Sequence, residues 1–155
     1  MLIISHRGNL TGPNPSKENS IDYIEEAILE GFDVEVDLWA KDNYFYLGHD
    51  QPQYFVSVEW LKAFKNNLWM HCKNKEALEK ISNLEDFNYF WHEADKYTIT
   101  SKGIGWVLVG EIPYSKSILV LPEKSNLELE YIKKSYGVCT DNALFYRCLL
   151  NNTVK

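Results

Sequence analysis

Two acidic residues stand one position apart in the apolar segment Val34–Leu38, and a histidine–aspartate pair follows at His49 and Asp50. In an extended strand, residues i and i+2 point the same way, so Glu35 and Asp37 share one face. Burying two neighbouring carboxylates costs free energy unless a cation lies between them. The spacing therefore predicts a cation-binding pair on a buried strand.

Further ionisable side chains fall at the ends of other apolar segments. His6 ends the first of them, His71 and Lys73 share a face of the segment 68–73, and Glu93 lies near the end of the segment 89–94. The carboxyl ends of parallel strands gather on one side of a sheet or barrel, where sites are built. A single E-x-D or a lone histidine is more often structural, but the convergence of several such groups favours a site.

The elements that must position these residues alternate through the first half of the chain. Hydrophobic periodicity and turn residues predict strands at 2–5, 32–39, 68–73 and 89–94, and helices at 20–31, 57–67 and 75–84. This order predicts a parallel sheet with crossover helices. The second half is expected to hold strands within 96–112, 116–123 and 137–141, with helices only at 126–137 and 143–152.

Composition narrows the class of protein. A chain of 155 residues with 45% hydrophobic residues is expected to form a single domain, residues 1–155. A net charge of −6 and the lack of a basic run argue against a nucleic-acid partner. The three cysteines lack C-x-x-C spacing, and neither a signal peptide nor a stretch long enough for membrane insertion is present, so we expect a cytoplasmic protein with reduced thiols.

Four short motifs, taken together, resemble a known family. They are "HRG" at His6–Gly8, "EN" at Glu18–Asn19, "E-x-D" at Glu35–Asp37 and "HD" at His49–Asp50. In this order and at nearly this spacing they resemble the glycerophosphodiester phosphodiesterase family. That family belongs to the phosphatidylinositol phospholipase C-like phosphodiesterases, which include the spider-toxin phospholipases D. The resemblance covers about the first third of the chain and continues faintly in "WMHCKN" and "GVCTDNA".

The resemblance implies a phosphodiesterase on a TIM-derived barrel with one divalent cation, usually Mg²⁺ or Ca²⁺. Carried over position by position, it implies that His6 and His49 are an acid–base pair. It also implies that Arg7 and Lys73 bind the phosphate, and that the metal ligands are Glu35, Asp37 and His71.

The sequence departs from the family in three respects. His71 stands where the family has a carboxylate, which favours a softer ion such as Mn²⁺ or Zn²⁺ or leaves Glu93 as the substitute ligand. The segment from Glu35 to His49 lacks the family's usual threonine and is one residue shorter. A full barrel needs about 250 residues. We therefore expect an α/β fold, a reduced TIM-type (β/α) barrel with several helices missing in the C-terminal half, and a homodimer that covers the exposed strands.

The expected function is metal-dependent hydrolysis of a small-molecule phosphodiester, similar to a glycerophosphodiester, by two-histidine acid–base catalysis. Two alternatives remain open at this point. One is a weak or inactive module that binds a phosphate-bearing ligand on the same fold. The other is a phospholipase D-like enzyme acting on lysolipid head groups, which would need an apolar rim (Trp39, Tyr44, Phe45 and Tyr46).

Overall fold

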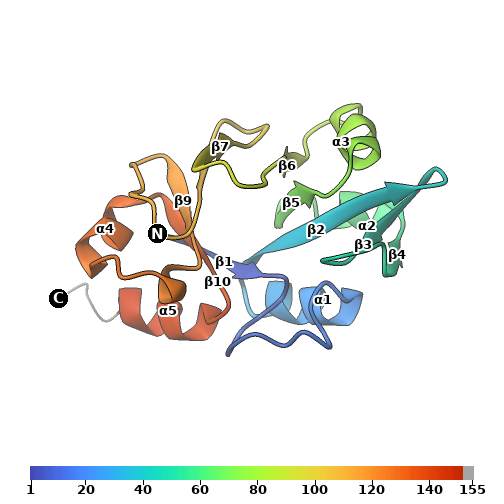
Figure 1. Cartoon of the computed structure of the whole chain (residues 1–155). Coiled ribbons are helices and arrows are strands. Elements are labelled where there is room, and N and C mark those ends of the chain that lie inside the picture. The colour runs from blue at the N-terminus through green and yellow to red at the C-terminus, as the bar shows by residue number, and fades with distance from the viewer. Residues whose placement is uncertain (152–155) are drawn as a thin grey trace.

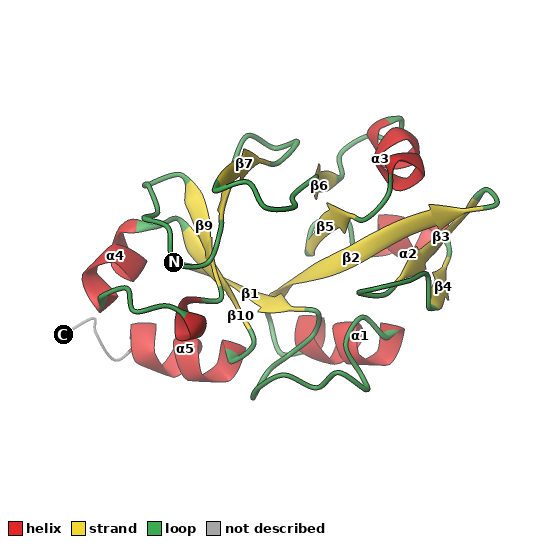
Figure 2. Ribbon diagram, in the orientation of Figure 1, coloured by secondary structure: helices red, strands yellow, loops and turns green. Residues whose placement is uncertain are grey.

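The computed structural model describes residues 1–151, which form one ten-stranded sheet flanked by helices (Figures 1 and 2). The strands are β1 (Leu2–His6), β2 (Asp33–Lys41), β3 (Tyr44–Leu47), β4 (Tyr54–Val56), β5 (Leu68–Cys72), β6 (Asn88–Phe90), β7 (Tyr97–Ile99), β8 (Gly105–Val107), β9 (Ser117–Val120) and β10 (Gly137–Thr140). The helices are α1 (Ile21–Leu29), α2 (Val58–Ala63), α3 (Lys75–Ser82), α4 (Leu129–Lys134), α5 (Ala143–Asn151) and a 3₁₀ turn, η1 (Pro122–Lys124).

The sheet has a parallel body with antiparallel additions. Strands β6, β5, β2, β1, β10, β9 and β8 are successive parallel neighbours, and β7 runs antiparallel to β8. The long strand β2 also continues into an antiparallel hairpin with β3, to which β4 pairs. In register, His6 lies opposite Glu35 and Asp37 lies opposite His71, so these four side chains start from adjacent positions at one end of the sheet.

The sheet curls into a half-barrel but does not close. Within residues 1–151 no strand pairing joins β6 to β7. The two edges are linked by the backbone bond from Ser101 N to Tyr89 O (2.8 Å) and by the Thr98 hydroxyl, which donates to the Trp91 carbonyl oxygen (3.1 Å). The expected TIM-type (β/α) barrel is therefore wrong: strands dominate a mixed, open sheet. A parallel crossover needs a dozen or more residues, and the short turn 100–104 allows only a hairpin between β7 and β8.

Helices cover one part of the curved sheet and leave another uncovered. In Figure 1, α1, α2 and α3 lie outside the strands of the first half, and α4 and α5 lie outside the strands of the second half. No helix occurs between β6 and β9, where Tyr97, Ile99 and Ile112 are exposed. Missing helices in the second half were expected, and the homodimer inferred from them stays a prediction.

The concave side of the sheet has its own small core. One buried side chain from each of six strands, β1, β5, β6, β8, β9 and β10, packs there (Ile4, Trp69, Phe90, Trp106, Ile118 and Cys139). The aromatic rings of Phe90 and Trp106 lie 4.4 Å apart. This core forms an apolar floor below the carboxyl ends of the strands, where the ionisable residues lie.

Most expected elements are present with shifted ends. The strand expected at 116–123 is the clearest difference, because β9 ends at Val120 and the chain turns at Leu121, whose φ is 45°. The proline that follows starts η1, which continues to Lys124. The helix expected at 143–152 is α5, and its last expected residue, Asn152, lies outside the described residues.

Candidate functional site

A cavity of about 350 Å³ opens at the carboxyl ends of the strands, above the apolar floor. Its polar side is lined by side chains from β1, β2, β5 and the loop after β3 (His6, Arg7, Glu35, His49, His71 and Lys73). Its other side is lined by apolar residues in and directly after β8 and β9. The structure thus brings to one cavity six of the seven residues that the sequence singled out, and the seventh, Asp37, lies directly behind them.

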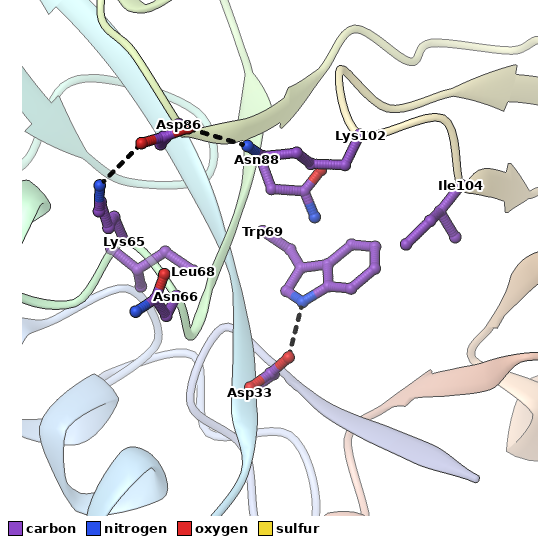
Figure 3. Close-up of a pocket in the computed structure, with 9 residues that line it drawn as sticks. All are labelled: Asp33, Lys65, Asn66, Leu68, Trp69, Asp86, Asn88, Lys102 and Ile104. Atoms are coloured by element: carbon purple, nitrogen blue, oxygen red, sulfur yellow. Dashed lines mark hydrogen bonds and ion pairs between the residues drawn. The ribbon is translucent and has the colours of Figure 1, made fainter.

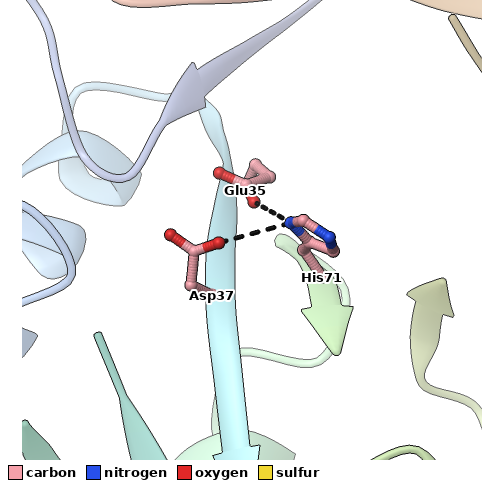
Figure 4. Close-up of side chains that lie close together, drawn as sticks. All are labelled: Glu35, Asp37 and His71. Atoms are coloured by element: carbon pink, nitrogen blue, oxygen red, sulfur yellow. Dashed lines mark ion pairs between the residues drawn. The ribbon is translucent and has the colours of Figure 1, made fainter. Parts of the chain in front are cut away.

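Glu35, Asp37 and His71 form a compact group that could hold a metal ion, with one ligand atom from each lying within 4.8 Å of the others (Figure 4). His71 Nδ1 lies 3.3 Å from Asp37 Oδ1 and 3.8 Å from Glu35 Oε1. The two acids come from β2 and the histidine from the neighbouring β5. Both carboxylates are buried, as the i, i+2 spacing on a core strand predicted.

The hydrogen bonding of this group fits a cation at its centre. Glu35 Oε2 and Asp37 Oδ1 are buried without a hydrogen-bond partner. His71 Nε2 lies 2.7 Å from the His92 carbonyl oxygen, which can only accept, so Nε2 carries the hydrogen. In the neutral ring, Nδ1 then directs a lone pair at two carboxylates. Such an arrangement is repulsive unless a proton or a metal ion lies between them.

The two carboxyls differ sharply in their electrostatic surroundings. Burial, followed by the neighbouring Asp37 charge, raises the pKa of Glu35. Burial alone would also raise the pKa of Asp37, but His49, His71, Arg7 and Lys73 together lower it well below its usual range. Arg7 Nε and Lys73 Nζ lie 2.8 and 3.5 Å from the Asp37 oxygens. Asp37 is therefore the fixed anion of the site, and Glu35 is an acid that a cation would help to ionise.

Asp37 is also held rigidly by the loop before α1. Asn19, buried and with a φ of 63°, donates from Nδ2 to Asp37 Oδ2 (3.0 Å) and accepts from the Asp37 backbone N–H (2.9 Å). Asparagine tolerates this left-handed conformation better than most residues. Glu18, just before it, accepts from Arg7 Nη1 (3.2 Å). Of the "EN" pair, Glu18 therefore orients Arg7 and Asn19 orients Asp37.

The "HRG" segment turns sharply so that Arg7 points back over the strand ends. Arg7 and Gly8 have φ angles of 55° and 91°. A Cβ on Gly8 would lie 2.8 Å from Tyr23 Cδ1, so both the backbone angle and the close contact require glycine. The contact between Arg7 Nε and Asp37 lacks hydrogen-bond geometry and acts as an ion pair.

His6 is oriented by an aspartate from the far end of the chain. Its Nδ1 lies 2.6 Å from Oδ1 of the buried Asp141, directly after β10, and its Nε2 faces the cavity, 3.8 Å from Glu35 Oε2. Burial lowers the pKa of His6, but the bond to Asp141 and the charge of Glu35 outweigh burial and raise it above the ordinary value. This pair leaves Nε2 as the nitrogen that can exchange protons with a ligand.

Replacing Asp141 by asparagine should lower the pKa of His6, because burial then acts without the opposing carboxylate. In the wild type, the stability gained from protonated His6 is complete below its unfolded pKa of about 6.5 and is lost as the pH rises through the higher folded value. The variant should lose this pH-dependent gain. Titration of the His6 ring signals by NMR measures the shift, and an unchanged His6 pKa would contradict the assigned role of Asp141.

His49 approaches Asp37, whereas His6 approaches Glu35. It follows β3, where Gly48 accepts from Trp39 Nε1 (2.6 Å), and its Nδ1 lies 3.4 Å from Asp37 Oδ2. With 47% of its side chain exposed, His49 lies at the mouth of the cavity. Each imidazole is therefore close to one of the two carboxylates, and His6 is 12% exposed whereas His49 is 47% exposed.

The structure does not support two other expectations from the sequence, the substitute metal ligand and the apolar rim. Glu93 lies exposed at the cavity wall and is outside the group that could hold a metal, so His71 occupies the third position beside the acid pair. Of the aromatic residues considered for an apolar rim, Phe45 is buried in the core behind β2, Trp39 and Tyr46 are half-buried, and Tyr44 is exposed. These four side chains do not form one continuous exposed rim.

A second hollow, of about 270 Å³, lies at the opposite, amino-terminal ends of the strands (Figure 3). Its charged groups are mostly paired with each other: Lys65 and Lys102 lie 3.2 and 3.7 Å from Asp86. Asp33 accepts from Trp69 Nε1 (3.0 Å), which fixes the indole ring within the apolar floor. These contacts stabilise the fold at this end of the sheet. The group of acids and histidines that forms the candidate site lies at the carboxyl ends of the strands.

Sequence reasoning missed several residues that support the site. Asp141 also accepts from Asn9 Nδ2 (2.9 Å), its backbone N–H donates to Glu123 Oε1 (2.7 Å), and Lys124 Nζ lies 3.2 Å from its Oδ2. The available signal was an aspartate directly after the last apolar strand, in "GVCTD".

The sequence matches no protein-family model and no curated protein. Within residues 1–151, no helix is both long and apolar enough to cross a membrane.

Proposed function

We propose that this protein is a metal-dependent phosphodiesterase that cleaves a small phosphodiester by acid–base catalysis between His6 and His49. One observation carries the proposal. Two buried carboxylates, each with one oxygen that lacks a hydrogen bond, lie close to two imidazoles and two cationic side chains at or directly behind one cavity. Perturbed ionisable groups that converge in a cavity are characteristic of active sites.

The positive groups of the site would lower the electrostatic barrier to attack on a phosphodiester. Arg7 and Lys73 supply positive charge that offsets the repulsion between the phosphate oxygens and an attacking group. A divalent cation held by Glu35, Asp37 and His71 would add to this charge as a Lewis acid. Because Asp37 is ionised and ion-paired with both Arg7 and Lys73, these two side chains are already in place before the substrate arrives.

The two histidines handle the protons. One accepts the proton of the nucleophile, water or a neighbouring substrate hydroxyl, and the other donates a proton to the leaving alkoxide. Imidazole suits both roles because its ordinary pKa is near 6.5. The raised pKa of His6 keeps this ring protonated to higher pH.

Hydrolysis of bis(p-nitrophenyl) phosphate tests the proposal directly. After removal of metal with a chelator, we expect no turnover, and addition of Mg²⁺, Ca²⁺, Mn²⁺ or Zn²⁺ in separate samples should restore it with at least one ion. The nitrogen of His71 favours Mn²⁺ or Zn²⁺ over the other two. The Glu35→Gln variant is the matched control and should not be rescued. Hydrolysis that is indifferent to the chelator would contradict the metal assignment.

A phosphate-binding module is the second candidate, and His71 favours it because the nitrogen replaces the carboxylate that the family resemblance implies. The same samples separate the two functions. A module should show a rise in melting temperature with metal and inorganic phosphate but no release of nitrophenolate, whereas the enzyme should show both.

A further inference from the structure

The cavity has two chemically different halves. The polar half, described above, comes from the ends of β1, β2 and β5 and from the loop after β3, and His92 and Glu93 line the cavity after β6. The other half is formed by Trp106 on β8, by Leu108 and Val109 just after it, and by Val120 and Leu121 at the end of β9. Apart from the indole nitrogen of Trp106, the side chains of this apolar wall carry no hydrogen-bonding group.

The apolar wall is firmly built. Trp106 is only 3% exposed and packs on Phe90. Leu121 keeps a left-handed backbone, with φ 45° and ψ 55°, directly before a proline, a conformation that leucine rarely adopts. Its backbone N–H donates to the Cys139 carbonyl oxygen (2.7 Å). Such strain persists where the surrounding structure fixes it and is concentrated at functional sites.

The same turn connects the apolar wall to the reacting groups. Two residues after Leu121, Glu123 accepts from the Thr140 hydroxyl (2.9 Å) and from the Asp141 backbone N–H (2.7 Å). Asp141 in turn holds His6. The position of the wall is therefore fixed relative to the imidazole that faces the phosphate.

We infer that the ligand of this cavity is a phosphodiester with at least one apolar alcohol, an alkyl or aryl group that packs against the apolar wall while the phosphate lies between Arg7 and Lys73. This inference rests on the proposed function. A polyol such as glycerol would place hydroxyl groups against valine and leucine side chains, where they would lose their hydrogen bonds to water. An alkyl group buries the same surface without that loss.

Binding of alkylphosphonates, which are not hydrolysed, tests this inference without relying on turnover. In calorimetry with the metal-loaded protein, affinity should rise about three- to fourfold for each methylene from methyl- to hexylphosphonate. Glycerol phosphate should bind more weakly than propylphosphonate. Phenylphosphonate and octylphosphonate distinguish the source of the alcohol: a gain that stops at hexyl indicates a short alkyl or aryl group, and a continued gain indicates a lipid chain.

Two variants locate the effect. Leu121→Asn keeps a residue that tolerates the left-handed backbone, and Val120→Thr keeps the shape of the side chain, so at least one should fold. Both should reduce the gain per methylene and leave methylphosphonate affinity unchanged. Leu29→Asn, at an 88% exposed position, is the control and should behave as wild type.

The outcomes separate this inference from the proposed function. Affinity that is independent of chain length, or tighter binding of glycerol phosphate, overturns the apolar alcohol even if phosphodiesters are hydrolysed. A chain-length dependence without any hydrolysis supports the apolar wall as a ligand site and contradicts the proposed enzyme.

Discussion

Replacing His6 by alanine should lower the turnover of a phosphodiester about 10²- to 10⁴-fold, the usual contribution of a positioned acid or base. His6 is the imidazole whose Nδ1 is fixed by Asp141, so its Nε2 is the more sharply oriented of the two proposed proton-transfer groups. Initial rates at saturating metal and substrate measure the loss. The fold should persist, because the substitution leaves the buried Asp141 its contacts with Asn9 and Lys124.

His92→Ala is the matched control for this experiment. The His92 ring bonds to the Asp95 carbonyl oxygen, and its centroid lies 6.3 Å from that of the His71 ring. The substitution keeps the His92 backbone carbonyl, which accepts from His71 Nε2, and removes no group to which a role in proton transfer is given. This variant should therefore retain nearly the full rate. Equal activity of wild type and His6→Ala would remove His6 from the chemistry.

Neutralising the two acids one at a time should affect the melting temperature of the metal-free protein differently. Asp37→Asn leaves Arg7 and Lys73 without their buried counter-charge, a loss of about 3–5 kcal/mol for a buried ion pair. The melting temperature should fall by on the order of 10 °C. Glu35→Gln removes a charge that burial and Asp37 already disfavour, so the melting temperature should stay equal or rise.

On the proposed metal site, both variants should nevertheless lose the stabilisation expected from a divalent cation, because each removes a charged group that would bind it. Thermal melts of the wild type and both variants, with chelator and with added Mn²⁺, give the melting temperatures that this comparison needs. The pattern is specific to the arrangement found here, with one carboxylate surrounded by cations and the other beside it. Destabilisation of the metal-free protein by both substitutions to the same extent would show that Glu35 is ion-paired as strongly as Asp37.

Several features of the site could be predicted from local sequence. The i, i+2 spacing placed Glu35 and Asp37 on one face, and the structure confirms that both are buried beside His71. The alternation of strands and helices in the first half correctly predicted parallel neighbours and thus the convergence of strand ends. These features depend on side-chain direction and on connections between successive elements, which neighbouring residues carry.

Other features depend on strand order over the whole chain. The expected TIM-type (β/α) barrel was wrong because β7 turns back on β8, and the apolar pattern at 96–112 does not by itself mark where this segment turns. The burial of Phe45 and the reversal at Leu121 likewise depend on what packs against them.

The sequence by itself determined which acids share a strand face, which histidines follow strand ends, and that the second half has few helices. Only the tertiary structure decided that the sheet stays open, that Asp141 orients His6 from 135 positions away, and that an apolar wall faces the charged groups. The reason is physical. Side-chain alternation is a property of a few consecutive residues, whereas the partner of a buried charge is decided by which distant strands become neighbours.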